Sequence, residues 1–364
     1  MPMARANTQM VVRVRVADGI RLAVGARQFT LVWPKTFMTS LRLVARRCGI
    51  ICIVLIVFAS LLARDARAEK LVLPEGTEAT LGKIYSFDLD GAINDAKRLQ
   101  REHPDHPLGF LLEAEARWWR IWCLAAEFKY GMTDARHRQK LPADQRYLEL
   151  AASALTIAEN HLKEHETAEM HFYAGLASAF SARLYGLRGE NRATARAGVK
   201  AREHFLRAAQ LDPQMADADF GLGLYNYYVD TLSTIVKILG FFMGIPGGNK
   251  LEGIRQLEHA IGDGVLTPDA ARFYLALDLH RYDQRYERAL TVIAPLADKY
   301  PSNPLFQLAR GDLYGKLARK EKAVAAYRAA ESLPVADEEC RARIQTLARA
   351  GLSAQGVMEQ APAH

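Results

Sequence analysis

DAARFYLALDLHRYDQRYERALTVIAPLADKYPSN, residues 269–303, is followed directly by PLFQLARGDLYGKLARKEKAVAAYRAAESLP, residues 304–334. Each segment holds two stretches of helical periodicity, separated by the short polar turns RYDQRY and KLARKE. A 34-residue offset superposes small and apolar residues of the two segments, such as Ala289 on Ala323. A period of this length is typical of arrays built from stacked helix pairs.

Five residues of the second segment follow a regular spacing: Gly311, Tyr314, Ala323, Tyr327 and Ala330. With a small residue late in the first helix and alanines on both sides of an aromatic in the second, the segment resembles the tetratricopeptide repeat family. The resemblance implies an all-α, helix-turn-helix repeat solenoid. In such an array small residues let paired helices approach, and large residues fill the hole in the next helix.

Looser copies of the pattern precede these two segments. For example, KLEGIRQLEHAIGDG reads as the second helix of a unit, with Leu257 on its packed side. We therefore expect about six units over residues 84–337 and a capping helix at 338–350. A linker at 69–83 and a disordered tail at 351–364 are expected on either side. A non-repeating α-helical domain is the alternative.

One unit contains an apolar insert. Twelve positions separate Gly311 from Ala323, whereas thirty separate Gly223 from Gly253, so TLSTIVKILGFFMGIPGG at 231–248 is extra. Its length and Lys237 argue against a membrane span. In one interpretation the first helix continues through these residues and the rest folds back as a lid on the groove. In the other, an exposed apolar lip binds a partner or a bilayer surface; its residues are Ile238, Phe241, Phe242 and Ile245.

The positive charge of the chain is confined to its leading segment. Residues 1–68 hold eleven Arg or Lys and two Asp, which leaves 37 basic and 39 acidic side chains in the rest of the chain. The formal net charge of +7 therefore does not describe the repeat region. Nucleic-acid binding depends on basic groups that meet phosphates, so the composition of the repeat region does not support it.

The leading segment has the anatomy of a secretory signal peptide. MTSLRLVARRCGIICIVLIVFASLLARDARA, residues 38–68, has a basic start, an apolar run at 49–63 and small residues before Glu69. The run is shorter than the ~20 residues that span a bilayer, so we expect cleavage. We expect Met38 to be the true start and residues 1–37 to be a mis-assigned extension. The alternative is a signal-anchor that holds the protein in the inner membrane through residues 49–63.

Two of the four cysteines, Cys123 and Cys340, lie outside the leader. An oxidising compartment would allow one disulfide between them. In an extended array they would be far apart, so we expect free, buried thiols. No cysteine pair has the spacing of metal ligands.

No sequence motif makes a strong case for catalysis. His161, Glu164 and His165 match the H-x-x-E-H order of inverted zinc peptidases, but a match this short arises by chance, and a solvated helix end is the favoured interpretation. Trp118 and Trp122 lie one turn apart, a spacing more typical of core than of an aromatic ligand cradle. We expect a protein that is not an enzyme and that has no metal or cofactor.

The resemblance also suggests where a partner would bind. In tetratricopeptide proteins partner segments commonly lie in the concave groove formed by the first helices. The matching positions here are Phe172, Phe220, Leu224, Tyr227, Tyr274, Asp278 and Arg281. Chaperone-binding members use lysine and asparagine to hold a carboxylate, whereas this chain has aromatic and aspartate residues. This departure favours an apolar or aromatic-anchored ligand, or a groove filled by the insert.

Together these features predict an exported, periplasmic protein-interaction scaffold or assembly factor of the bacterial cell envelope, with protein partners. The alternative is a binding module for a small apolar or lipid-like ligand in a groove covered by residues 231–248. Because a fold alone does not specify a function, both are expectations that follow from the resemblance.

Overall fold

The computed structural model describes residues 71–232, residue 237 and residues 244–357. The expected signal peptide at 38–68 and the expected extension at 1–37 lie outside the described residues. So do three of the predicted lip residues, Ile238, Phe241 and Phe242. Among the described residues, no helix is both long and apolar enough to cross a membrane.

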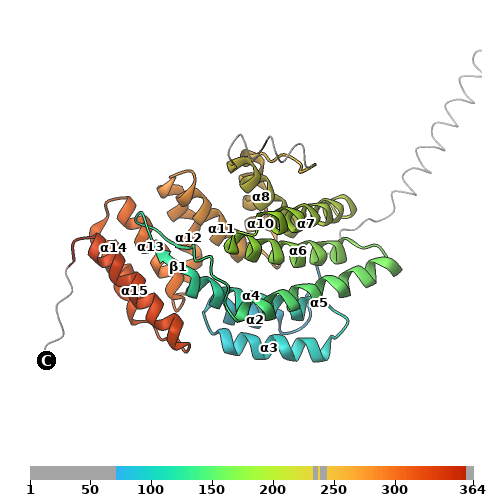
Figure 1. Ribbon diagram of the computed structural model, residues 1–364, viewed down its shortest axis with the longest axis horizontal. Helices are drawn as coiled ribbons and strands as arrows, with labels where there is room; N and C mark the ends of the chain where they lie inside the picture. The colour runs from blue at the N-terminus through green and yellow to red at the C-terminus, as the bar shows by residue number, and fades with distance from the viewer. Residues whose placement is uncertain (1–70, 233–236, 238–243, 358–364) are drawn as a thin grey trace, which may run out of the picture. The chain divides into compact units, whose positions relative to one another are not determined.

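The described part of the chain folds into 13 α-helices and one two-stranded sheet (Figure 1). Six consecutive helix pairs are followed by a single terminal helix. The pairs are α2 (Thr77–Tyr85) with α3 (Leu89–Glu102), α4 (Leu108–Ala125) with α5 (Ala143–Glu164), α6 (Ala168–Arg188) with α7 (Asn191–Leu211), α8 (Ala216–Thr231) with α10 (Lys250–Asp263), α11 (Pro268–Arg281) with α12 (Tyr286–Lys299), and α13 (Pro304–Lys316) with α14 (Lys320–Ser332). The terminal helix is α15 (Glu338–Ala354), which packs on α13 and α14.

This arrangement confirms the expected array of helix pairs. Two boundaries differ from the prediction. Residues 77–83 of the expected linker belong to α2, whose last two residues, Ile84 and Tyr85, are buried. Helix α15 extends past residue 350 to Ala354.

The 34-residue offset is visible in the backbone. Gln284 and Ala318 both adopt left-handed φ angles, 53° and 55°, in the turns that join α11 to α12 and α13 to α14. Ala289 and Ala323, one turn into the second helices, are both fully buried. The two most regular units therefore repeat in conformation as well as in residue type.

Small residues allow the close helix contacts that the sequence predicts. A Cβ atom on Gly311 would lie 2.6 Å from the ring of Tyr327, which fills the space between α13, α14 and α15. In the α8–α10 pair, a Cβ on Gly223 would lie 2.9 Å from the backbone oxygen of Gly253. Larger residues at these positions would force the paired helices apart.

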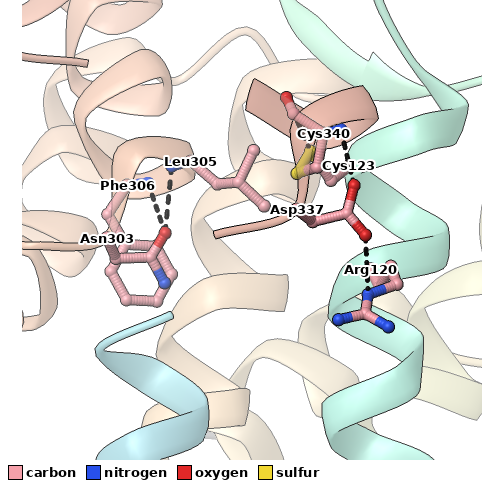
Figure 2. Close-up of a disulfide and its surroundings, with 7 residues drawn as sticks. All are labelled: Arg120, Cys123, Asn303, Leu305, Phe306, Asp337 and Cys340. Atoms are coloured by element: carbon pink, nitrogen blue, oxygen red, sulfur yellow. Dashed lines mark hydrogen bonds and ion pairs between the residues drawn. A yellow bond between two sulfur atoms is a disulfide. The ribbon is translucent and has the colours of Figure 1, made fainter. Parts of the chain in front are cut away.

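The ends of the array meet. Helix α4 packs against α15, and the Cα atoms of Cys123 and Cys340 are 5.8 Å apart in a disulfide that spans 217 residues (Figure 2). The prediction of free thiols is therefore wrong. It assumed an extended array, whereas the curvature of this one brings its last helix back to its second unit.

Further contacts reinforce this closure. Figure 2 shows Arg120 of α4 paired with Asp337 at the start of α15, and the distance between Arg120 Nε and Asp337 Oδ2 is 3.2 Å. Asn303 caps α13 by accepting from the backbone N–H of Leu305, and its Nδ2 donates to the backbone oxygen of Tyr85 at 2.9 Å. The N-terminal and C-terminal units thus share a polar and a covalent link.

A short hairpin departs from the all-α expectation. Strands β1 (Ala126–Phe128) and β2 (Thr133–Ala135) pair antiparallel directly after α4. In Figure 1 the β1 label lies among α4 and the C-terminal helices, and β1 contacts α15. Strands of three residues carry too little alternation to be recognised in the sequence.

The described parts of the insert show where its first helix ends. Helix α8 stops at Thr231, and Leu232 has an extended backbone with ψ 150°, so the prediction that this helix continues through the insert is wrong. The returning residues lie along α8, because the Tyr225 hydroxyl donates to the backbone oxygen of Pro246 at 2.7 Å. Gly248 approaches the backbone of Asn226 so closely that a Cβ would lie 2.5 Å from its oxygen.

Candidate functional site

Most of the predicted groove residues lie inside the protein. Phe172 and Tyr227 have no exposed surface, and Phe220 and Asp278 are 6% and 2% exposed. Leu224 and Tyr274 are half-buried, and only Arg281 is exposed. The inner side of the first helices is therefore largely covered.

Aromatic residues of α4 provide part of that cover. The ring centroid of Trp119 lies 4.7 Å from that of Phe273 in α11 and 5.5 Å from that of Phe306 in α13. Trp122 also contacts Phe273, and Trp118, Trp119 and Trp122 are all at most 5% exposed. The interpretation of this aromatic stripe as core is confirmed.

The hairpin covers the next part of the same side. Asp312 of α13 accepts from the backbone N–H of Thr133 at 2.6 Å and from the Tyr327 hydroxyl at 2.9 Å. Asp134 pairs with Arg281 of α11 at 2.8 Å. Burial raises the pKa of the Asp312 carboxyl to about 7, because it outweighs the donors from Thr133 and Tyr327. Arg281, a groove position expected to face a partner, thus binds this chain's own hairpin.

A partly buried ion pair lies where α4, α5, α6 and α11 come together. Arg183 Nη2 lies 2.5 Å from Glu115 Oε2, and Arg183 also donates to the hydroxyls of Tyr147 and Tyr274 at 2.7 and 3.2 Å. The guanidinium is 4.0 Å from the ring centroid of Phe180. Sequence reasoning missed this cluster, because its members are spread from residue 115 to 274 with no local motif.

A small cavity adjoins this ion pair. Its wall comes from α2, α4, α6, α8 and the start of α11, and includes Tyr85, Leu112, Phe180, Phe220 and Ala270. No described residue of the 231–248 insert lines it. The cavity therefore differs in position from the ligand groove that the sequence suggested beneath the insert.

Exposed apolar side chains gather where the insert leaves and rejoins the array. Tyr228 and Leu232 lie four residues apart at the end of α8 and are 36% and 43% exposed. Tyr282, at the end of α11, is 39% exposed, and its ring centroid lies 6.2 Å from that of Tyr228. We call Tyr228, Leu232 and Tyr282 the insert-base patch. Ile245, the one described lip residue, is half-buried on the returning leg of the insert.

Polar contacts are made by residues next to the patch in the sequence. Lys250, at the start of α10, pairs with Asp283 at 2.6 Å, and its backbone N–H donates to Asp230 at 3.1 Å. The Tyr227 hydroxyl donates to the backbone oxygen of Asp278 at 3.0 Å. Burial raises the pKa of the Asp278 carboxyl well above its ordinary value, although Tyr228 and Arg281 lower it.

The histidine motif has an ordinary structural role. His161 Nε2 lies 2.8 Å from the backbone oxygen of Asp105, and His165 follows the last residue of α5. Within the described ranges, no group of three or more His, Cys, Asp or Glu residues is arranged to hold a metal ion.

Comparisons with known proteins leave the structure as the main guide to function. The chain matches no protein-family model and no curated protein sequence.

Proposed function

We propose that this protein is an exported, non-catalytic scaffold of the tetratricopeptide type, which binds a protein partner of the bacterial cell envelope through the insert-base patch. The repeat type is supported by the 34-residue offset between the left-handed residues Gln284 and Ala318. Export is supported by the signal-like segment at 38–68 and by the Cys123–Cys340 disulfide, because disulfides persist mainly in oxidising compartments.

The observation that carries the binding proposal is the exposure of two packed tyrosine rings beside a leucine. Seven large apolar side chains are exposed in the described part of the chain, and three of them form the insert-base patch. Single exposed apolar residues are normal on a protein surface, whereas contiguous ones commonly mark interaction sites. Tyrosine is also enriched among residues that dominate binding energy at interfaces.

The filled inner side of the array favours this surface over the predicted groove. A partner segment in the groove of α11 and α13 would have to displace the hydrogen bond from Thr133 to Asp312 and the ion pair between Asp134 and Arg281. Binding at the insert-base patch displaces no contact of the described residues. The adjoining insert would enlarge this surface if residues 238–245 act as the apolar lip.

Site-specific photo-crosslinking tests this proposal. A photoreactive phenylalanine analogue at Tyr282 should capture a discrete envelope protein in intact cells, whereas the same analogue at Tyr130 should not. Tyr130 is a suitable control because it is 76% exposed but lies at the tip of the hairpin, apart from the patch. Equal capture at both positions, or capture at Tyr130 alone, would reject the patch as the binding surface.

A further inference from the structure

Both tyrosines of the insert-base patch belong to a triangle of three aromatic rings. The ring centroids of Tyr227, Tyr228 and Tyr282 lie 6.1, 6.1 and 6.2 Å from one another. The plane of Tyr228 is nearly perpendicular to the planes of the other two rings, at 82° and 80°. Tyr227 has no exposed surface, whereas Tyr228 and Tyr282 are 36% and 39% exposed. The triangle therefore has one buried ring and two rings that a partner can reach.

The Tyr228 hydroxyl lies in buried surroundings. Burial raises the pKa of this phenol well above its ordinary value, and the nearby carboxyl of Asp278 raises it further. The exposed surface of Tyr228 is thus provided by its ring and not by its hydroxyl. The face of an aromatic ring carries partial negative charge and attracts cations.

Arg281 shows that a cation can lie against these rings. Its Cζ is 5.0 Å from the ring centroid of Tyr282, within the ~6 Å over which a ring attracts a cation. Its Nη1 is 2.8 Å from Asp134 Oδ2, so much of its charge is already neutralised. In the part of the chain that the structure describes, no Lys or Arg lies over the ring of Tyr228.

A buried carboxyl beside the triangle lacks a full set of partners. Asp278 of α11 is 2% exposed, and its Oδ2 accepts no hydrogen bond from the described residues. Tyr228 and Arg281 lower the pKa of this carboxyl, but burial has the larger effect and raises the pKa well above its ordinary value. The negative charge is therefore poorly compensated in the free protein. A cation bound against Tyr228 would supply the missing positive charge.

We propose that the insert-base patch receives an arginine side chain of the envelope partner. The planar guanidinium stacks on aromatic rings and stays charged, and arginine is enriched among residues that dominate binding energy at interfaces. Leu232, which is 43% exposed, is placed to contact the apolar stem of that side chain. This inference rests on the proposed function, because it specifies what the partner contributes to the same surface.

Two blocked tripeptides test the charge requirement. They are N-acetyl-Gly-Arg-Gly-amide and the same peptide with citrulline, whose urea group is uncharged and has nearly the same shape. Tyrosine ring signals of the purified protein would be followed by NMR during titration. We expect saturable shifts of Tyr228 and Tyr282 with the arginine peptide, and about three- to tenfold weaker binding of the citrulline peptide. Equal affinity of the two peptides, or no saturable shift of these rings with the arginine peptide, would overturn the proposal.

Three variants test the position of the site. Tyr282→Leu removes one ring and should weaken binding of the arginine peptide about threefold or more. Tyr282→Phe keeps the ring and should bind like the wild type, as should Tyr130→Leu at the tip of the hairpin. The NMR spectra also show whether each variant is folded. Full affinity in folded Tyr282→Leu protein would place the peptide elsewhere and reject the site.

The peptide result is separable from the test of the proposed function. If photo-crosslinking from Tyr282 captures an envelope protein but the two peptides bind equally, the patch is a binding surface and the arginine proposal is wrong. If crosslinking fails but the arginine peptide binds with the expected preference, the cation site stands and the proposed envelope partner is wrong.

Discussion

Three non-glycine residues in the turns of described helix pairs, Phe87, Gln284 and Ala318, adopt a backbone conformation that suits glycine better. Gln284 and Ala318 have positive φ angles where the chain turns from the first helix of a unit to the second. For a residue with a Cβ atom this left-handed conformation costs roughly 1 kcal/mol. The turn geometry of the repeat evidently requires it, since it recurs at the same place in both regular units.

Replacing Ala318 with glycine should therefore stabilise the protein. We expect Ala318→Gly to raise the free energy of unfolding by about 0.5–1 kcal/mol, because glycine adopts this φ without strain. Ala325→Gly, at an exposed position inside α14, should lower it by about 1 kcal/mol. Urea denaturation of both variants measures the difference. Destabilisation by Ala318→Gly would show that the left-handed turn is absent.

A buried histidine makes stability depend on pH. His280 is 4% exposed, and burial, with a smaller effect from Lys316, lowers its pKa to about 4. Between that value and the ordinary pKa near 6.5 the unfolded chain binds more protons at this residue, so its contribution to stability falls as the pH is lowered through this range.

Replacement of His280 by leucine removes this contribution. The free energy of unfolding of His280→Leu relative to the wild type should rise by up to about 3 kcal/mol as the pH is lowered from 7 to 4. Urea denaturation of both proteins across this range gives the comparison directly, and other titrating groups cancel in the difference. Parallel pH profiles would mean that His280 is protonated equally in the folded and unfolded states.

The hairpin is an element held by distant partners and not by its own strands. Its three-residue strands would not be stable in isolation. Asp312 accepts from the Thr133 backbone and the Tyr327 hydroxyl, both in buried surroundings. Removal of this carboxyl leaves two buried donors without an acceptor.

Asp312→Ala should therefore lower the free energy of unfolding by about 2 kcal/mol and loosen the hairpin. Amide hydrogen exchange should become faster at residues 126–135 than in the wild type. Asp298→Ala breaks a solvent-exposed pair with Arg310 and should change stability by less than about 0.5 kcal/mol. If the two variants behave alike, Asp312 does not hold the hairpin.

The sequence predicts those elements whose signals are local. Helix pairs over 269–334 follow from periodicity, and the burial of Trp118 and Trp122 follows from their helical spacing. The hairpin could not be predicted, because its anchor joins residues 179 positions apart. The end of α8 was missed for another reason: apolar residues continue past Thr231 without a break in composition.

The candidate sites, like the hairpin, could not be predicted from local sequence signals. Tyr228 and Tyr282 are separated by an insert and a helix, and only the fold shows that their rings meet. Phe172 and Tyr227 were assigned to a groove by comparison with open solenoids, but the inner side of this array is filled. The partner surface depends on the packing of neighbouring units, because its two tyrosines come from the ends of α8 and α11.

Closure distinguishes the whole molecule from an open stack of helix pairs. Helix α15 returns to α4, Asn303 bonds to the backbone at Tyr85, and a disulfide joins positions 217 residues apart. In the chain-entropy treatment a loop of this length stabilises the folded state by about 5 kcal/mol. The disulfide therefore stabilises the contact between α4 and α15, and α4 carries the aromatic side chains that help to fill the inner side of the array.

Peptide mapping under non-reducing conditions tests this closure most directly. The protein would be isolated from the cell envelope with free thiols blocked, then digested and analysed by mass spectrometry. We expect one linked pair of peptides, one containing Cys123 and the other Cys340, which separates on reduction. Recovery of both cysteines as blocked free thiols would contradict the closed array and remove the main structural support for export.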